Sequence, residues 1–373
     1  MKRILPLLLV GLAFLSPSWS AALEDSQDAE KIRVAIDRGG KRLAVEGEGL
    51  LVLNEEGKLL PVLSPLLVEW QGKELLLGGK STRRLTMTAV SPLKIGKRSY
   101  RGVVELVATA DGILAINDLP LEEYLVGLIN CEISSLWPLE AVKAQAVVAR
   151  TYALFQKRTR RGALYDVEST VLDQVYQGCM LEDSRAVRAV QETAGEVLLY
   201  EGKPVQAFYH STCGGHTELP ENVWGFSLPY LMDQECSYCS TAPSYRWEQR
   251  LSLPRIEAAL RRQGVIEGHL SSVKEGRRSR GGRLVELTIM DGRGERAISA
   301  PLFRKAMGYD LLPSTAFTIQ RTGEELLFKG EGKGHGVGLC QWGANGQAKE
   351  GRSYRQILAY YYHDVCLTRL YPL

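Results

Sequence analysis

The feature that most constrains this chain is a change of hydrophobic spacing near residue 118. Before it, short apolar runs alternate with turn residues, which is typical of β-strands. After it, apolar residues recur at helical spacing in two stretches: Leu121, Tyr124, Leu125, Leu128 and Ile129, then Leu139, Val142, Ala146, Ala149 and Ala153. Because strands come first and helices follow, we predict an α+β fold with an N-terminal β-rich domain.

Both helical stretches carry end signals. Asp118-Leu119-Pro120 precedes the first, where an Asp can cap the helix and a Pro suits its first turn. Pro138 suits the start of the second, and Gly162 follows the cations at 157–161 that favour its end. The alanine face of the second helix predicts close packing against its neighbours.

Further patterns divide the chain into segments. We expect a helix near 184–193, a hairpin over 197–210 and two helices after a Gly-rich loop at 332–338. The assigned boundaries are 1–22 for a signal peptide, 23–31 for a linker, 32–111 for the β-rich domain, 112–249 for a mixed helix and strand region, 250–325 for an inserted strand–helix–strand segment, and 326–373 for the C-terminal motif and helices that complete the region begun at 112.

The N-terminus predicts export. A basic head, Lys2-Arg3, precedes an apolar run that ends before Pro17, and small residues near position 20 offer a cleavage site. The run is shorter than the roughly 20 residues that span a bilayer, and no later stretch reaches that length. We therefore expect a mature protein without a transmembrane segment, in the periplasm or on the cell-wall side of the cytoplasmic membrane.

Charge and cysteine content narrow the function classes. A net charge of +3 over 373 residues lacks the basic excess of a nucleic-acid-binding protein. Seven cysteines are too few for a disulfide scaffold. Export makes disulfides feasible and cytosolic redox chemistry improbable.

Glu132 is the first candidate for chemistry. It lies between the two predicted helices, after an apolar stripe and before Trp137-Pro138. A carboxyl beside an aromatic at such a junction can have the raised pKa that a general acid needs. Its position alone is more typical of a solvated glutamate at a helix end.

A cysteine and histidine set forms the second candidate. Cys213 and His216 are three positions apart, as are Cys236 and Cys239. Such paired ligands suit a tetrahedral structural zinc. In an exported protein, a disulfide from Cys213 to Cys236 or Cys239 is the competing interpretation.

The third candidate is the Gly-rich run around His335. Its glycines do not have the Gly-x-Gly-x-x-Gly spacing of a dinucleotide site. They let the backbone and His335 approach another surface closely. The run therefore suits either the lining of an active site or a tight structural turn.

Three ordered blocks resemble the stage II sporulation protein D (SpoIID) family, also called the amidase-enhancer (LytB) family. The resemblance covers about residues 112–363. The blocks are 124–153, with Glu132-Ile133 and Trp137-Pro138 inside it, His210-Ser211-Thr212-Cys213-Gly214-Gly215-His216-Thr217, and 334–344. One departure is that Leu172-Asp173 stands before Gln174-Val175-Tyr176, where some sporulation members carry metal-binding His and Cys residues.

The resemblance implies a peptidoglycan lytic transglycosylase. Such an enzyme cleaves the MurNAc–GlcNAc bond of glycan strands stripped of stem peptides, and it requires no cofactor. The family's catalytic glutamate falls on Glu132. Motif membership makes five further residues candidates for orienting Glu132 or the glycan: Lys143, Gln145, Arg150, His335 and Gln341. The match does not imply sporulation, because the family extends beyond spore formers.

Two other functions compete with the enzyme. A family member can act as an activator that binds and stimulates a cell-wall amidase without cutting glycan. It can also be a peptidoglycan-binding module with a degenerate site. Glu132 favours the enzyme, because a pure activator has no need for a carboxyl at that position.

Overall fold

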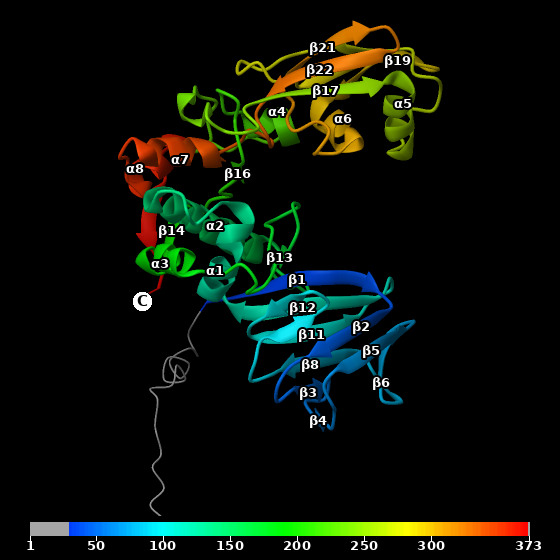
Figure 1. Cartoon of the computed structure of the whole chain (residues 1–373), viewed down its shortest axis with the longest axis vertical. Helices are drawn as coiled ribbons and strands as arrows, with labels where there is room; N and C mark the ends of the chain where they lie inside the picture. Colours follow the sequence, from blue (N-terminus) through cyan, green and yellow to red (C-terminus); the bar gives the residue numbers. More distant parts are fainter. Residues whose placement is uncertain (1–29, 372–373) are drawn as a thin grey trace, which may run out of the picture.

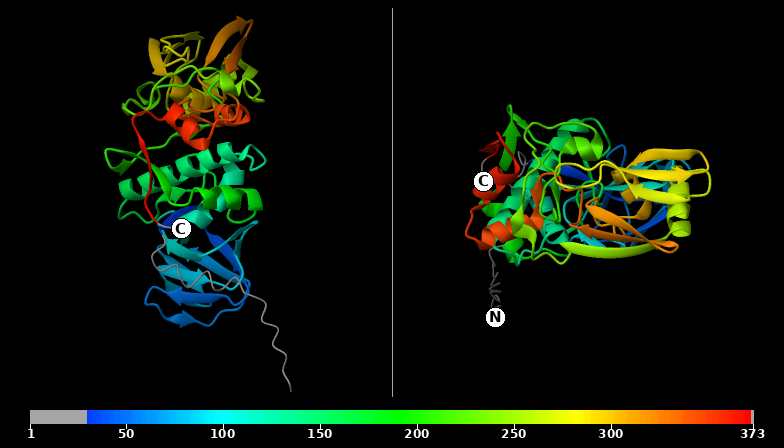
Figure 2. Two further views of the ribbon diagram at one scale, coloured as in Figure 1. Left: turned by 90° about the vertical axis from the view of Figure 1, so that its left-hand side faces the viewer. Right: turned by 90° about the horizontal axis from the view of Figure 1, so that it is seen from above.

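The computed structural model describes residues 30–371, which form three tiers along the longest axis (Figure 1). A β domain lies at one end, a mainly helical tier in the middle, and a mixed segment at the other end (Figure 2). This mixture of helices and strands confirms the α+β class. The predicted signal peptide and most of the predicted linker lie outside the described residues. Within residues 30–371, no helix has both the length and the apolar character needed to cross a bilayer.

The β domain consists of two antiparallel-rich sheets. The larger sheet contains, in order, β13 (Val167–Glu168), β1 (Lys31–Gly40), β12 (Ile113–Pro120), β11 (Val103–Ala108), β8 (Arg84–Thr88), β3 (Leu51–Asn54) and β4 (Leu59–Leu60). The smaller contains β10 (Arg98–Tyr100), β9 (Leu93–Ile95), β2 (Arg42–Glu46), β5 (Leu66–Gln71), β6 (Glu74–Leu77) and β7 (Lys80–Thr82). Alternating side chains of both sheets share one apolar core.

Strand β12 carries the chain from this domain into the helices. It pairs with β1 on one side and β11 on the other, and most of its residues are buried. The sheet thus runs through Asp118 to Pro120, where the sequence predicts a helix start. Pairing on both sides keeps these residues extended, and α1 (Leu121–Glu132) begins directly after them without a side-chain cap. The β-rich unit therefore extends past the boundary placed at residue 111.

The middle tier is organised around one long buried helix. The helices are α1, α2 (Leu139–Thr159), α3 (Ser184–Glu192), α4 (Pro220–Trp224), α7 (Gln341–Lys349), α8 (Tyr354–Tyr361) and the short 3₁₀ helix η3 (Ser237–Cys239). Helix α2 packs against α1, α3, α7 and α8. Its alanines are almost fully buried, as the alanine face predicts. Strands β14 (Glu196–Tyr200), β15 (Lys203–Pro204) and β24 (Cys366–Arg369) form a small sheet beside it.

A short parallel pair brings distant motifs together. Strand β16 (Tyr209–His210) pairs with β23 (Leu339–Cys340), so the second and third sequence blocks lie side by side. Main-chain hydrogen bonds between Thr212 and Lys333 extend the contact. The expected hairpin over 197–210 is therefore shorter than predicted, because residues 209–210 pair with β23 instead.

The inserted segment forms the third tier. Its elements are β17 (Arg246–Ser252), α5 (Leu253–Arg262), β18 (Ser272–Glu275), β19 (Glu286–Asp291), β20 (Gly294–Ser299), α6 (Ala300–Met307), β21 (Phe317–Thr322) and β22 (Glu325–Glu331). Two three-stranded sheets and two helices enclose a separate apolar core. Because β17 pairs with β22 from residue 246 to residue 331, the segment is somewhat longer than 250–325.

Candidate active site

Glu132 is the last residue of α1, at the start of the short connection from α1 to the long helix α2. Ile133 after it is extended, so the chain turns away immediately. The C-terminal end of a helix carries partial negative charge, which disfavours a carboxylate there. The position itself therefore favours the protonated form of Glu132.

Three groups from other parts of the chain surround the carboxyl. Its Oε1 accepts a hydrogen bond of 2.7 Å from the backbone N–H of Val175. The side chains of Tyr209 and Gln341 are also within hydrogen-bonding reach. These donors come from three separate segments, so the fold as a whole fixes the carboxyl.

The pKa of Glu132 is raised to about 7. Desolvation of the carboxyl is the largest cause, because burial disfavours the charged form. The hydrogen bonds from Val175, Tyr209 and Gln341 lower the pKa, but they do not offset the desolvation. A carboxyl with this pKa is partly protonated at neutral pH, which is the range in which general acid–base catalysis works best.

Tyr209 is itself held by a buried hydrogen-bond chain. Tyr124 donates from its hydroxyl to Oε1 of Gln174 at 3.2 Å, and Gln174 donates from Nε2 to the hydroxyl of Tyr209 at 3.1 Å. Because the Tyr209 oxygen accepts from Gln174, its own proton is free to point at Glu132. Burial, together with the charge of Glu132, raises the pKa of Tyr209 well above its usual value, so the phenol keeps that proton.

Gln341 is held in a similar way by Gln145. Its Nε2 donates to Oε1 of Gln145 at 3.3 Å, which links the first residue of α7 to α2. Both side chains are buried. The structure thus brings together three residues that the sequence analysis singled out: Glu132, Gln145 and Gln341.

Glu132 opens into a surface pocket of about 380 Å³. Two aromatic side chains, Trp137 and Trp342, line it and meet edge to face with ring centroids 5.0 Å apart. Glu132 is the sole carboxylic acid among the described residues that line the pocket, which are Asn130, Cys131, Glu132, Ile133, Ser134, Trp137, Ser211, Gln341 and Trp342. The pocket therefore offers one titratable carboxyl beside a partly apolar wall.

Lys143 and Arg150 do not line this pocket. Lys143 pairs with Glu140 at 3.0 Å and with Glu192 at 2.5 Å. Arg150 is fully buried and donates hydrogen bonds to both carboxylate oxygens of Glu122, at 2.8 and 2.7 Å. Glu122 is on α1, the helix that ends at Glu132, and Arg150 is on α2. The ion pair therefore joins the two helices without contacting the carboxyl of Glu132.

His335 also lies apart from the residues that line the Glu132 pocket. Its ring packs against Phe208, Trp224 and His210 at centroid distances of 5.9, 5.0 and 5.5 Å. Its Nδ1 accepts a 3.1 Å hydrogen bond from the N–H of Val337. Burial, with the nearby positive groups, holds the pKa of His335 well below its usual value, so the ring is neutral.

The cysteine cluster differs from the predicted one in one member. Cys213, Cys236 and Cys239 do come together, but the fourth residue is Cys340, not His216. His216 donates from Nδ1 to the carbonyl of Thr217 at 2.8 Å instead. In the structure all seven cysteines are free thiols, and Sγ of Cys213 lies 3.3 Å from Sγ of Cys239.

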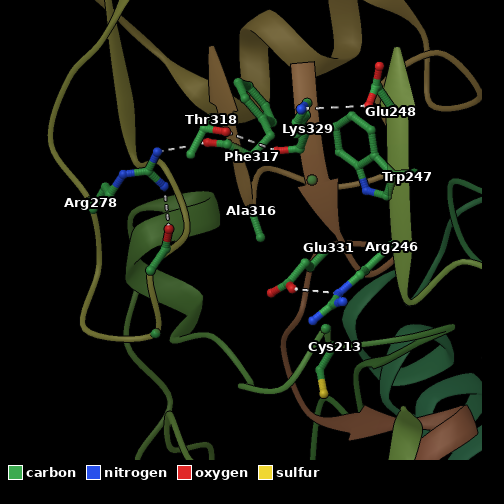
Figure 3. Close-up of a pocket in the computed structure, with 14 residues that line it drawn as sticks. Cys213, Arg246, Trp247, Glu248, Arg278, Ala316, Phe317, Thr318, Lys329 and Glu331 are labelled. Carbon is green, nitrogen blue, oxygen red and sulfur yellow. Dashed lines mark hydrogen bonds and ion pairs between the residues drawn. The ribbon is translucent and has the colours of Figure 1, made fainter. Parts of the chain in front are cut away.

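A larger cavity lies in the inserted tier. It measures about 680 Å³ and is formed by β17, β21, β22 and the turn near Arg278 (Figure 3). Charged residues of both signs and the rings of Trp247 and Phe317 line it. In the described chain it shares no lining residue with the Glu132 pocket, so the two hollows are separate.

Comparison with known proteins identifies the family. The profile of SpoIID, "Stage II sporulation protein", matches residues 109–200, which contain Glu132, Gln174 and Val175. Stage II sporulation protein D of Bacillus amyloliquefaciens is 31% identical over 268 residues, covering 67% of this chain and 75% of that protein. This chain belongs to the SpoIID family. The family resemblance drawn from the three sequence blocks is thereby confirmed.

Two further proteins and a second family profile are similar to this chain. An uncharacterised protein of Brachyspira hyodysenteriae is 35% identical over 267 residues, with 71% of each chain covered. The amidase enhancer of Bacillus subtilis is 30% identical over 292 residues, which is 65% of this chain and 40% of that protein. A second profile, "Domain of unknown function (DUF8618)", matches residues 228–338, so this SpoIID member carries that domain across its inserted tier.

Four residues of the Glu132 site and of the cysteine cluster were not predicted from the sequence. Val175 and Tyr209 interact with Glu132 directly, and Gln174 holds Tyr209. Cys340 is the fourth member of the cysteine cluster. Cys340 stands inside the third sequence block, one residue before Gln341, so its spacing could have suggested it. The backbone donor of Val175 has no signal in the sequence.

Proposed function

We propose that this SpoIID protein is an exported peptidoglycan lytic transglycosylase with Glu132 as its single acid/base. Family membership and the relative named amidase enhancer support a cell-wall-related function and location. The observation that carries the finer proposal is a lone carboxyl with a pKa of about 7 in an aromatic-walled pocket.

The chemistry needs one carboxyl that changes role. Protonated Glu132 gives its proton to the glycosidic oxygen as the bond from MurNAc C1 to that oxygen breaks. The C6 hydroxyl of the same MurNAc attacks C1, and the carboxylate of Glu132 takes the hydroxyl proton. The products are a 1,6-anhydroMurNAc end and a free GlcNAc hydroxyl, and Glu132 is protonated again.

The absence of a second acid in the pocket supports this route over hydrolysis. Hydrolytic glycosidases generally use two carboxyl groups, one as the acid and one as the base or nucleophile. Among the described residues that line the pocket, Glu132 stands alone. A pKa near 7 also suits both halves of the cycle, because neither protonation state is strongly disfavoured.

The surrounding residues receive roles from their contacts. Val175, Tyr209 and Gln341 hold the carboxyl in place and stabilise its charged form after proton donation. Trp137 and Trp342 present aromatic rings to the pocket, where the apolar face of a sugar can stack. Tyr209 and Gln341 are positioning residues, since they act through Glu132.

A second function is favoured by one comparison. The relative named amidase enhancer points to an activator that binds a cell-wall amidase. For such an activator, the carboxyl of Glu132 is dispensable and the effect appears only when the amidase is present.

The test is mass spectrometry of denuded glycan strands incubated with the mature chain. We expect anhydroMurNAc ends with the wild type, none with Glu132→Gln, and wild-type amounts with Glu350→Gln, which changes an exposed carboxyl after α7. Reducing MurNAc ends would indicate hydrolysis. Uncut denuded strands with folded wild-type protein, together with faster release of stem peptides from intact peptidoglycan by an added amidase, would favour the activator.

A further inference from the structure

We propose that Cys213, Cys236, Cys239 and Cys340 bind a structural Zn²⁺ ion through four thiolates. Their sulfur atoms all lie within 4.8 Å of one another, and all four residues are buried. A tetrahedral zinc with Zn–S bonds of about 2.3 Å separates its sulfurs by about 3.8 Å. The 3.3 Å between Sγ of Cys213 and Sγ of Cys239 and the upper limit of 4.8 Å bracket this spacing.

Three separate chain segments contribute the cysteines. Cys213 follows β16, Cys236 precedes the single turn of η3 and Cys239 ends it, and Cys340 ends β23 next to α7. The Cys-x-x-Cys pair on a turn is typical of structural zinc sites. Four buried thiols, of which Cys340 lies more than a hundred residues beyond the other three, are best explained by a common ligand.

Hydrogen-bond donors surround the sulfurs. Sγ of Cys340 accepts from the backbone N–H groups of Cys213 and Gly343, each at 3.2 Å. Sγ of Cys236 lies 3.3 Å from the hydroxyl of Tyr361. Donors of this kind stabilise metal-bound thiolates and orient them. A Cβ on Gly343 would come within 2.9 Å of Sγ of Cys236, so a glycine keeps that space open.

A buried positive charge stands beside the cluster. Arg283, from the turn before β19, is almost fully buried and donates to the main-chain carbonyls of Cys213 at 2.6 Å and Gly334 at 3.3 Å. Its Nε has no hydrogen-bond partner among residues 30–371. Zinc with four thiolates has a net charge of −2, and this charge would compensate the buried guanidinium.

The donor set selects the ion. Four thiolates are soft ligands that favour zinc over magnesium or calcium, and a site without an open position serves structure rather than catalysis. If the thiols begin protonated, binding of Zn²⁺ releases four protons. In Figure 3, Sγ of Cys213 points away from the other labelled residues of the larger cavity, so the sulfur belongs to the cluster and not to that hollow.

The ion would support the Glu132 pocket without taking part in its chemistry. Cys340 is followed directly by Gln341 and Trp342, which line that pocket. Zinc would therefore join the start of α7 to the segments of Cys213 and η3. The metal site itself does not depend on the proposed glycan cleavage.

Metal analysis of the purified chain lacking residues 1–22, prepared without added metal, tests the site. We expect about one zinc per chain, loss of at least nine-tenths of it in Cys239→Ser and Cys340→Ser, and unchanged content in Cys366→Ser, where the cysteine is exposed. Iron in place of zinc, or metal-free protein with four reactive thiols, would overturn the assignment. A mass lower by two hydrogens, showing a disulfide, would also overturn it.

A second measurement uses only the wild type, in case the cysteine variants do not fold. Zinc is replaced by Co²⁺, and the absorption spectrum is recorded. Four thiolates around tetrahedral cobalt give strong sulfur-to-metal charge-transfer bands and visible d–d bands. Their presence, with displacement of the cobalt by one equivalent of Zn²⁺, is the expected result, and a spectrum typical of octahedral oxygen ligands would contradict the proposal.

Discussion

The carboxyl of Glu132 accepts a 2.7 Å hydrogen bond from the backbone N–H of Val175, 43 residues further along the chain. This contact joins the end of α1 to the irregular segment that follows β13. Because the donor belongs to the main chain, no substitution at residue 175 other than proline removes it. It leaves the pKa of Glu132 at about 7, since desolvation outweighs it.

The first prediction concerns the pH dependence of glycan cleavage. Glu132 must be protonated to begin the reaction, so kcat/KM should fall above a pH of about 7, approaching tenfold per pH unit. The measurement is kcat/KM on denuded glycan between pH 5 and pH 9. A rate that stays constant to pH 9 would show that another group supplies the proton.

The second prediction concerns stability. The folded-state pKa of Glu132 is raised from 4.5 to about 7, so the native state binds this proton more tightly than the unfolded chain does. The protonated form is fully present in both states below pH 4.5, and the native state loses stability as the pH rises from 4.5 to 7. The loss is at most about 3 kcal/mol, and it remains above pH 7.

Glu132→Gln removes that loss. We expect the variant to unfold at a higher urea midpoint than the wild type at pH 8, and at nearly the same midpoint at pH 4. Glu350→Gln, at an exposed position, should show no such pH-dependent difference. A Glu132→Gln variant that is less stable than the wild type at pH 8 would contradict the raised pKa.

The third prediction concerns Tyr209. Its side chain lowers the pKa of Glu132, so Tyr209→Phe should raise that pKa. A hydrogen bond worth roughly 1 kcal/mol corresponds to a shift of about 0.7 pH units in the alkaline limb of the rate profile. Tyr200→Phe is the matched control, because the Tyr200 ring packs against Tyr230 and is not among the groups that shift the pKa of Glu132. A lower rate with an unshifted profile would indicate a structural effect only.

The fourth prediction separates Arg150 from Lys143. Arg150 is fully buried with two bonds to Glu122, so Arg150→Ala should lower the free energy of unfolding by about 3 kcal/mol or more. Lys143 pairs with carboxylates at the surface of α2 and α3, so Lys143→Ala should cost about 1 kcal/mol or less. Urea titrations of the two variants beside the wild type measure both losses of unfolding free energy. Equal losses would contradict the larger contribution expected from the buried Arg150.

The helices were readily predicted, but the end of the strand that precedes them was not. The spacing of apolar residues located α1, α2 and α3, because an amphipathic helix has to bury one face. Asp118 and Pro120 carry local helix-start signals, yet pairing of β12 with β1 and β11 keeps them extended. Tertiary pairing overrode the local preference there.

Part of the candidate site was also open to prediction. Glu132 and Gln341 belong to sequence blocks, and the structure places them in one pocket. The exchange of His216 for Cys340 depends on the parallel pairing of β16 with β23, which joins segments more than a hundred residues apart. Contacts at that sequence separation leave no local periodicity, so spacing alone cannot find them.

Digestion of denuded glycan in H₂¹⁸O tests the central claim most directly. If Glu132 acts alone and the MurNAc C6 hydroxyl is the nucleophile, every new MurNAc end is a 1,6-anhydro sugar without ¹⁸O, and Glu132→Gln makes none. New MurNAc ends that carry ¹⁸O at C1 would show that water is the nucleophile, and they would contradict a transglycosylase with a single carboxyl.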